Sequence, residues 1–327
     1  MPVDQGLAEL SDTLLLVAVL CYAVAMIGYA ADWAFGRPLS LRPIAGGATD
    51  TLPASWTQTT GRLGAAHPRR GAAVGAAAVA LTVLGWVVHA ASLTTRGLAV
   101  ERVPWGNMYE FSSAVCLAAV TGYLCLLYRQ PVRHLGAIVM LPVIVYLGIA
   151  GTLLYAPASP LVPALNSYWL KIHVAAAAIA TGIFMIGFTT TVLYLVQDAR
   201  ERRGRGGVNE QSRMPSVSSG GRMPSAASLD AVAYSLTAFA FPVWTFAVIA
   251  GAVWAEAAWG RYWGWDPKET WAFITWVLYA GYLHARPLPR WHGRRAAGVA
   301  VVAFVALMFC YFGVNLWISG LHSYAGV

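Results

Sequence analysis

Charged side chains are scarce in this chain. Lys, Arg, Asp and Glu make up only 11% of its 327 residues, whereas hydrophobic residues make up 58% and the mean hydropathy is +0.58. A soluble domain of this length cannot hide so many apolar side chains from water in one core. The composition therefore excludes an ordinary soluble globular protein and predicts a protein embedded in a lipid bilayer.

Cysteine is also scarce. The chain has four, and all of them fall inside apolar stretches, at Cys21, Cys116, Cys125 and Cys310. A redox dithiol, a zinc site and a covalently attached c-type haem need paired or clustered thiols, and no two of these cysteines form a Cys-x-x-Cys pair. The sequence thus lacks the ligands for all three sites, and we expect four small, buried apolar residues.

Long apolar runs occur eight times, and each is long enough to cross the hydrocarbon region as a helix. They cover residues 12–35, 72–94, 108–128, 135–155, 168–196, 231–257, 269–285 and 296–318, the seventh being the shortest. The flank before the first run holds acidic residues and neither Lys nor Arg, so we expect that run to be retained rather than cleaved as a signal peptide. The sequence therefore predicts an all-α, polytopic integral membrane protein with about eight transmembrane helices.

The net charge of +8 is distributed by loop. Arginines gather in alternate loops, at 36–71, 129–134, 197–230 and 286–295. Because basic loops of membrane proteins stay in the cytoplasm, this pattern places those loops inside and both termini outside. The same rule puts the 95–107 and 156–167 loops on the outer face. The basic charge is explained by membrane orientation, so we expect no nucleic-acid partner.

One segment differs in composition from the rest of the chain. Residues 197–230 are rich in Arg, Gly, Ser and Pro, and they repeat Arg-Met-Pro-Ser at 213–216 and 222–225. Such a composition is typical of disorder. We expect a disordered cytoplasmic linker that separates helices one to five, within 1–196, from helices six to eight, within 231–327.

Residues 259–271 concentrate aromatic rings at the outer end of the seventh run. A tyrosine and four tryptophans occur within thirteen residues, the tryptophans being Trp259, Trp263, Trp265 and Trp271. An aromatic belt at the lipid boundary explains one or two of these rings. Within the loop, Asp266-Pro267-Lys268-Glu269 is typical of a helix start with its acids at the positive end. The density of rings indicates a platform for a large, flat, apolar ligand.

Two histidines lie at the level of this loop. His173 is about five residues into the fifth run, roughly 8 Å below the outer boundary, and His322 lies just beyond the eighth run. An ionisable residue inside a span is costly and is therefore a functional candidate. Each histidine alone also fits an interfacial side chain. Together, on opposite sides of an aromatic surface, two neutral imidazoles can ligate a haem iron.

Two further histidines leave alternatives open. His284 lies fifteen residues after Glu269, about 22 Å deeper in a regular helix, so it cannot ligate the same iron. It marks either a second site or a helix-end histidine beside Arg286. His89 lies near the outer end of the second run, where it is either a third outer ligand or part of a polar seam with Ser92.

The tryptophan-rich loop with its Asp-Pro-Lys-Glu sequence resembles the WWD signature of the haem-handling protein superfamily. Within it, the chain resembles most the CcsA family, also called ResC and in some actinobacteria CcsB, the haem-handling subunit of system II cytochrome c maturation. His173 before the loop, His284 in the next helix and His322 after the last helix match the family's order, and the 104–110 segment is also similar.

The resemblance implies roles for these residues. Haem b, as a transient substrate, would be ligated through its iron by His173 and His322 and held by Trp259, Trp263, Trp265, Asp266 and Trp271. His284 would be a transmembrane haem ligand whose opposite ligand comes from a ResB-type membrane subunit. The implied function is haem transport across the bacterial plasma membrane and ligation of reduced haem to the Cys-x-x-Cys-His thiols of apocytochrome c. The chain would then be part of a cytochrome c synthetase complex of the haem lyase type.

Such a reaction needs few dedicated groups. Joining haem vinyl groups to two thiols requires reduced iron, reduced cysteines and orientation, so the protein's part is mainly positioning and we expect no separate catalytic residue. Arg261 and Lys268 are either partners of the haem propionates or surface cations. Two other functions stay open: a haem transporter or chaperone without ligation activity, and a membrane b-type cytochrome. The open aromatic loop favours a transiently bound haem over a permanent one.

Overall fold

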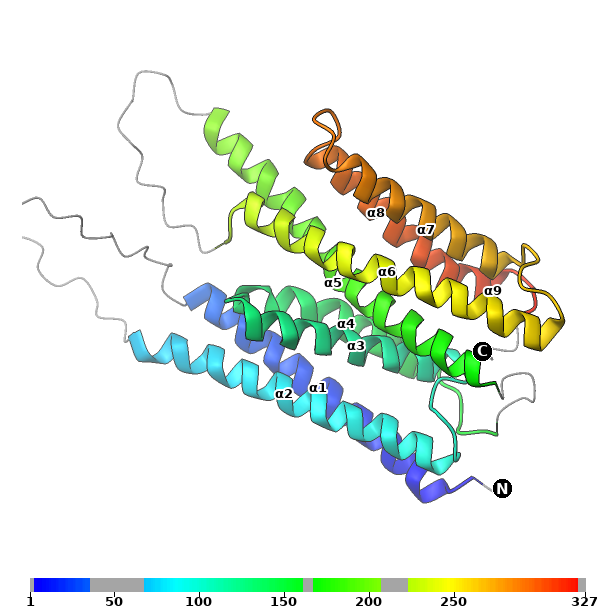
Figure 1. Cartoon of the computed structure of the whole chain (residues 1–327). Coiled ribbons are helices and arrows are strands. Elements are labelled where there is room, and N and C mark those ends of the chain that lie inside the picture. The colour runs from blue at the N-terminus through cyan, green and yellow to red at the C-terminus, as the bar shows by residue number, and fades with distance from the viewer. Residues whose placement is uncertain (1–2, 36–67, 161–166, 207–222, 323–327) are drawn as a thin grey trace, which may run out of the picture.

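The computed structural model describes residues 3–35, 68–160, 167–206 and 223–322, and these residues form helices joined by loops (Figure 1). The helices in chain order are α1 (Gln5–Phe35), α2 (Pro68–Ala99), α3 (Met108–Arg129), the short 3-10 turn η2 (Arg133–Leu135), α4 (Gly136–Thr152), α5 (Tyr168–Gly206), α6 (Ala226–Trp259), α7 (Pro267–Ala285), α8 (Arg294–Met308), the π-helical turn η4 (Phe309–Gly313) and α9 (Val314–Trp317). The all-α prediction is confirmed for these ranges.

Within the described part of the chain, seven helices are long and apolar enough to cross a membrane. They coincide with seven of the eight predicted runs, which confirms a polytopic membrane protein. The remaining run, the seventh at 269–285, forms helix α7, which has nineteen residues and is not among those seven helices. Its first turn carries Lys268 and Glu269, which lower its hydropathy. Helix α7 nevertheless packs along α8 within the bundle (Figure 1).

The helices alternate in direction through one bundle. Helix α1 packs along α2, α5 along α6 and α7 along α8, while α3 contacts both α4 and α5. Figure 1 shows that the loop joining α6 to α7 lies at the same end as the start of α1 and the end of α2. The turns from α3 to α4 and from α7 to α8 lie at the opposite end. The basic loops 129–134 and 286–295 are thus separated from the tryptophan-rich loop by the length of the bundle, as the charge alternation requires.

The boundaries predicted for the 197–230 linker were too wide. Helix α5 continues to Gly206 and α6 starts at Ala226. An ion pair of 2.8 Å between Asp198 and Arg202, one turn apart, supports the extension of α5. Residues 207–222 lie outside the described residues, as do 36–67 and 161–166 of the predicted loops.

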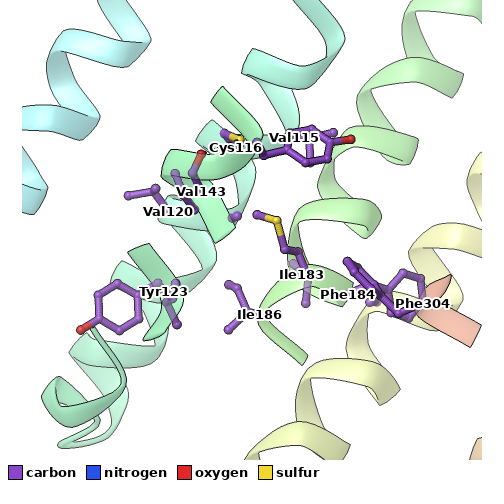
Figure 2. Packing of buried hydrophobic residues seen from close by; sticks show 14 of the residues in the cluster. Val115, Cys116, Val120, Tyr123, Val143, Ile183, Phe184, Ile186 and Phe304 are labelled. Carbon is purple, nitrogen blue, oxygen red and sulfur yellow. Dashed lines mark hydrogen bonds between the residues drawn. The ribbon is translucent and has the colours of Figure 1, made fainter. Parts of the chain in front are cut away.

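Figure 2 shows the part of the buried core where α3, α4, α5 and α8 meet; the core also includes residues of α1 and α6. Backbones approach closely there, because a Cβ added to Gly182 of α5 would lie 2.7 Å from the amide nitrogen of Ala119 and the carbonyl oxygen of Val115 in α3. Small residues permit such contacts between membrane helices, where dispersion forces rather than water drive packing. Gly182 is therefore a contact point that fixes the distance between α3 and α5.

The four cysteines differ in burial. Cys116 and Cys310 are buried and Cys21 is partly buried, but Cys125 is exposed on α3, so the expectation that all four are buried was wrong for that residue. An apolar side chain on a membrane helix has no need of burial in the protein, since lipid surrounds it. Sequence position within a span therefore does not predict which face a small residue occupies.

The close contact at Gly182 predicts the effect of enlarging it. Gly182→Leu should destabilise the protein by about 1–3 kcal/mol or more, because the new side chain meets backbone atoms that cannot move aside. The matched control is Gly148→Leu in α4, where an added Cβ meets nothing within 4 Å. Thermal unfolding in detergent, followed by circular dichroism, checks this. Equal unfolding temperatures for the two variants would contradict the packing described for α3 and α5.

Candidate functional site

The tryptophan-rich loop runs between two well-defined helix ends. Helix α6 stops at Gly260, whose φ of 72° is the left-handed conformation that favours glycine. Helix α7 starts after Asp266, whose side chain accepts from the Lys268 amide while the Glu269 side chain reaches back to the Asp266 amide. Pro267 occupies the first helical position. The helix start predicted from Asp-Pro-Lys-Glu is confirmed as a capping box.

Glu269 shapes the loop from inside. Its Oε2 atom accepts hydrogen bonds from the backbone amides of Gly264 at 2.8 Å and Asp266 at 3.1 Å. Between these two amides, Trp265 adopts a φ of 57°, which residues other than glycine adopt rarely, and its side chain is 65% exposed. Anchoring on both sides of Trp265 holds this conformation, and its ring meets that of Trp263 edge to face at 5.8 Å.

Asp266 joins the loop to the C-terminal segment. Beyond capping α7, its Oδ1 atom accepts from the Leu321 amide at 2.8 Å and its Oδ2 atom accepts from Nδ1 of His322 at 2.9 Å. A carboxylate oxygen can only accept here, so Nδ1 of His322 carries the proton and Nε2 carries the lone pair of the neutral ring. One carboxylate therefore sets both the position and the tautomer of His322.

This contact also shifts the ionisation of both partners. Burial alone would raise the pKa of Asp266, but the hydrogen bonds from His322 and the Leu321 amide outweigh it and bring the pKa to about 2. Burial lowers the pKa of His322, and the bond to Asp266 offsets part of that decrease. Because the Asp266 pKa is depressed on folding, its contribution to stability is present above about pH 4 and is lost as the pH falls toward 2.

His173 is held in the same manner by a different acceptor. Its Nδ1 atom donates to the backbone carbonyl of Ala247 in α6 at 2.7 Å. Room for the ring exists because the facing residue is Gly251, where an added Cβ would lie 2.7 Å from that nitrogen. A carbonyl oxygen cannot donate, so Nε2 again carries the lone pair of the neutral ring. The packing of α5 against α6 thus fixes the second imidazole.

Trp254 connects the two histidines. Its ring is 1% exposed and lies parallel to that of His173, with the centroids 6.3 Å apart. The same ring meets His322 edge to face at 5.7 Å and Trp259 at 4.8 Å. Sequence reasoning missed Trp254 because it belongs to the apolar run of α6, before the loop. Its spacing of five residues from Trp259 is the only signal that the sequence offered.

Two partly open cavities adjoin at this end of the bundle, with volumes of about 150 and 80 Å³. The larger lies toward α3 and α8, and the smaller lies under the tryptophan-rich loop. Six residues line both of them, namely His173, Trp244, Trp254, Lys268, Ala272 and His322. The two predicted ligands therefore lie together on the boundary between one mostly apolar cavity and one aromatic cavity.

The predicted aromatic platform divides into two groups. Trp259 and Trp263 line the smaller cavity. Trp265 and Trp271 are absent from the linings of both cavities described above. Trp271 packs instead against Phe309 of the π-helical turn, with centroids 4.2 Å apart. The loop thus presents one aromatic face to the cavity, while its other rings face outward or support neighbouring helices.

The other histidines lie elsewhere. His284 is exposed near the end of α7, at the opposite end of the bundle from the loop (Figure 1). His89 is fully buried, with Nε2 at 2.9 Å from Ser113 and Nδ1 at 3.3 Å from the hydroxyl of Tyr22. His89 was interpreted either as a third outer ligand or as part of a polar seam. Its contacts with Ser113 and Tyr22 match the polar seam between helices.

The segment before α3 forms part of the site. Asn107 caps α3 by accepting from the Glu110 amide at 2.8 Å, as its sequence predicts. The buried Glu110 carboxylate is bound by Arg96 and Arg102, and this ion pairing fixes the turn in which Trp105 lines the larger cavity. Sequence reasoning identified the cap but not the cavity wall.

Residues 105–322, which include both histidines and the loop, match the family described as Cytochrome C assembly protein. The chain therefore belongs to this family of polytopic membrane proteins for cytochrome c assembly.

More specifically, it belongs among the CcsA cytochrome c biogenesis proteins, which handle haem in cytochrome c maturation. It is 36% identical to CcsA of Guillardia theta over 252 residues, which cover 74% of this chain and 83% of the relative. CcsA of Porphyra purpurea is 35% identical, with 76% and 86% covered, and CcsA of Gloeobacter violaceus is 34% identical, with 76% and 85% covered.

A solved structure shares the fold. The cytochrome c haem lyase CcmF superposes with a TM-score of 0.61 at 15% sequence identity, covering 95% of this chain. This chain spans about half of that protein, since 47% of CcmF is covered. The similarity shows that the two proteins share an arrangement of helices, and at this sequence identity it concerns the fold alone.

The central place of Asp266 predicts the effect of removing its carboxylate. Asp266→Ala should speed amide hydrogen exchange at Leu321 by roughly tenfold, which corresponds to loss of about 1.4 kcal/mol of local stability. Asp4→Ala is the matched control. Asp4 also lies at a helix start, where it accepts from the Leu7 amide of α1, so this variant loses a similar helix cap and should leave exchange at Leu321 unchanged. Unchanged protection of Leu321 in Asp266→Ala would show that the C-terminal segment is held by other contacts.

Proposed function

We propose that this chain holds haem between His173 and His322 and presents it for attachment to apocytochrome c. One observation carries the proposal: in both rings Nδ1 donates to a protein acceptor, so in each neutral ring the lone pair that can ligate iron is on Nε2. Metal-binding histidines are oriented by this kind of second hydrogen bond. The two rings also share the walls of both cavities.

The surroundings suit a large, flat substrate. Trp254, Trp259 and Trp263 supply ring surface beside the two imidazoles. Aromatic stacking and apolar contact favour a macrocycle over a small polar molecule. Haem contributes its iron and two vinyl groups, and each thioether bond forms when a cysteine S–H adds across one vinyl C=C, with no leaving group. The chain contributes binding, exclusion of water and orientation of the vinyl edge.

Membrane orientation is inferred from the charge distribution. The basic turns after α3 and α7 lie at one end of the bundle and the histidine site at the other (Figure 1). By the positive-inside rule we assign the basic end to the cytoplasm and the tryptophan-rich loop to the outer face of the bacterial plasma membrane. Haem held there meets apocytochrome c on the outer side.

His284 fits a second, deeper site that needs a partner. Its side chain is exposed near the inner end of α7, so a second subunit can approach it. An ionisable residue on such a surface is a functional candidate by default. We propose that His284 provides one ligand for haem on its way outward, and that a ResB-type membrane subunit provides the opposite ligand.

Haem retention tests the outer site. His173→Ala and His322→Ala should each lower the haem retained by the purified protein by roughly tenfold or more, because removal of one axial ligand exposes the iron to exchange. The visible spectrum of the reduced protein measures this, and added imidazole should restore part of the low-spin spectrum. His292→Ala is the matched control, since that histidine is exposed in the turn before α8. Haem content unaffected by both changes would overturn the proposed site.

Reconstitution tests the complete function. This chain together with a ResB-type subunit, reductant, haem and apocytochrome c should yield haem covalently attached to the apocytochrome, detected by denaturing gel and pyridine haemochrome spectrum. His284→Ala should abolish most of this product when haem is supplied from the inner side, while leaving haem added directly to the outer site bound. If the protein binds haem but no thioether product forms, the proposed role in haem attachment is wrong and a role as haem transporter or chaperone is left.

A further inference from the structure

The larger cavity contains one unusual polar group. Its lining is mostly apolar and aromatic, and among the described residues that line it there is one lysine, Lys268, and no arginine or carboxylate. No ion pair within 4.0 Å joins Lys268 to an acidic residue in the described ranges. A cation placed in an apolar cavity without a paired acid is costly. Such a cost is commonly offset when an anionic ligand binds.

Asn315 completes a pair of donors. The ammonium of Lys268 donates to Oδ1 of Asn315 at 2.7 Å. Because an ammonium cannot accept, the amide of Asn315 must turn its oxygen to Lys268 and its Nδ2 away. That Nδ2 atom is buried and has no hydrogen-bond acceptor within the described residues. Both side chains line the same cavity as His173 and His322. Two donors are thus available to one acceptor group inside it.

A local irregularity of the last helix positions this pair. Residues Phe309–Gly313 form a π-helical turn, which inserts one extra residue and so rotates the next residues by about 100° relative to a regular helix. Asn315 lies two residues after that turn, in α9. The thiol of Cys310, inside it, lies 3.6 Å from the backbone carbonyl of Lys268. The turn therefore packs on the start of α7 and brings Asn315 beside Lys268.

We propose that Lys268 and Asn315 bind a propionate carboxylate of haem. The inference rests on the proposed function and adds to it the orientation of the macrocycle. Haem is apolar except for two carboxylates at one edge, and one ammonium with one amide N–H matches a carboxylate's two oxygens. Anchoring that edge directs the opposite, vinyl-bearing edge away from Lys268. Arg261, the other cation of the loop, is not among the residues lining either cavity.

A comparison of haem with its dimethyl ester tests the pairing. The ester keeps the iron and the ring but has no carboxylate, so the two probes differ only at the proposed contact. The wild-type protein in detergent should bind haem roughly tenfold or more tightly than the ester. Lys268→Met should weaken haem binding by a similar factor and leave ester binding unchanged. Asn315→Asp should do the same, because the new carboxylate pairs with Lys268 and repels the propionate. Arg261→Gln is the control and should retain the wild-type preference.

The outcomes separate the inference from the function on which it rests. If Lys268→Met keeps the full preference for haem over the ester, or loses affinity for both equally, the propionate contact is wrong while the histidine site stands. If the wild-type protein binds neither probe, or binds both with no dependence on His173 and His322, the proposed function itself fails. A wild-type protein that binds haem through both histidines but shows no preference over the ester also rejects the contact.

Discussion

The site depends on the carboxylate of Asp266. It starts α7, holds the Leu321 amide and orients His322, so the start of α7 and the C-terminal segment, which are distant in the sequence, meet at one side chain. Burial in a low-dielectric setting makes these hydrogen bonds strong, and their combined effect keeps the carboxylate ionised with a pKa of about 2. Without it, Leu321 and His322 would lose the hydrogen bonds that join them to the start of α7, and no acceptor at Nδ1 would fix the tautomer of His322.

Different contacts fix the two imidazoles, but in both rings Nδ1 is the nitrogen that donates a hydrogen bond. Helix packing and a backbone carbonyl fix His173, whereas a loop carboxylate fixes His322. The first arrangement is rigid, because α5 and α6 contact along their length. The second depends on the loop before α7 and on the segment that follows α9, both outside regular helices, and such segments open at lower cost than packed helices. This asymmetry suits a carrier whose cargo must leave: in our account His322 is the ligand that releases first when a histidine of the apocytochrome replaces it.

Much of the architecture could be predicted from sequence because the signals were local. Apolar runs located the helices, and Asp-Pro-Lys-Glu located the start of α7. Trp254 and Asn315 could not be found in this way, since one lies within an apolar run and the other depends on a π-helical turn that no local pattern marks. The predicted bounds of the 197–230 linker were too wide because composition alone does not show where α5 ends or where α6 starts. For Trp254 and Asn315, contacts between helices rather than spacing along one helix decided the outcome.

The family assignment and the cavity geometry answer different questions. Membership among the CcsA proteins establishes a role in cytochrome c biogenesis, while the hydrogen bonds at Nδ1 are the basis for assigning two particular histidines to the iron. The most direct test of that assignment is the electron paramagnetic resonance spectrum of the purified protein loaded with ferric haem. Our account predicts a six-coordinate, low-spin signal typical of two imidazole ligands, lost in His322→Ala. A five-coordinate, high-spin signal in the wild-type protein would contradict it.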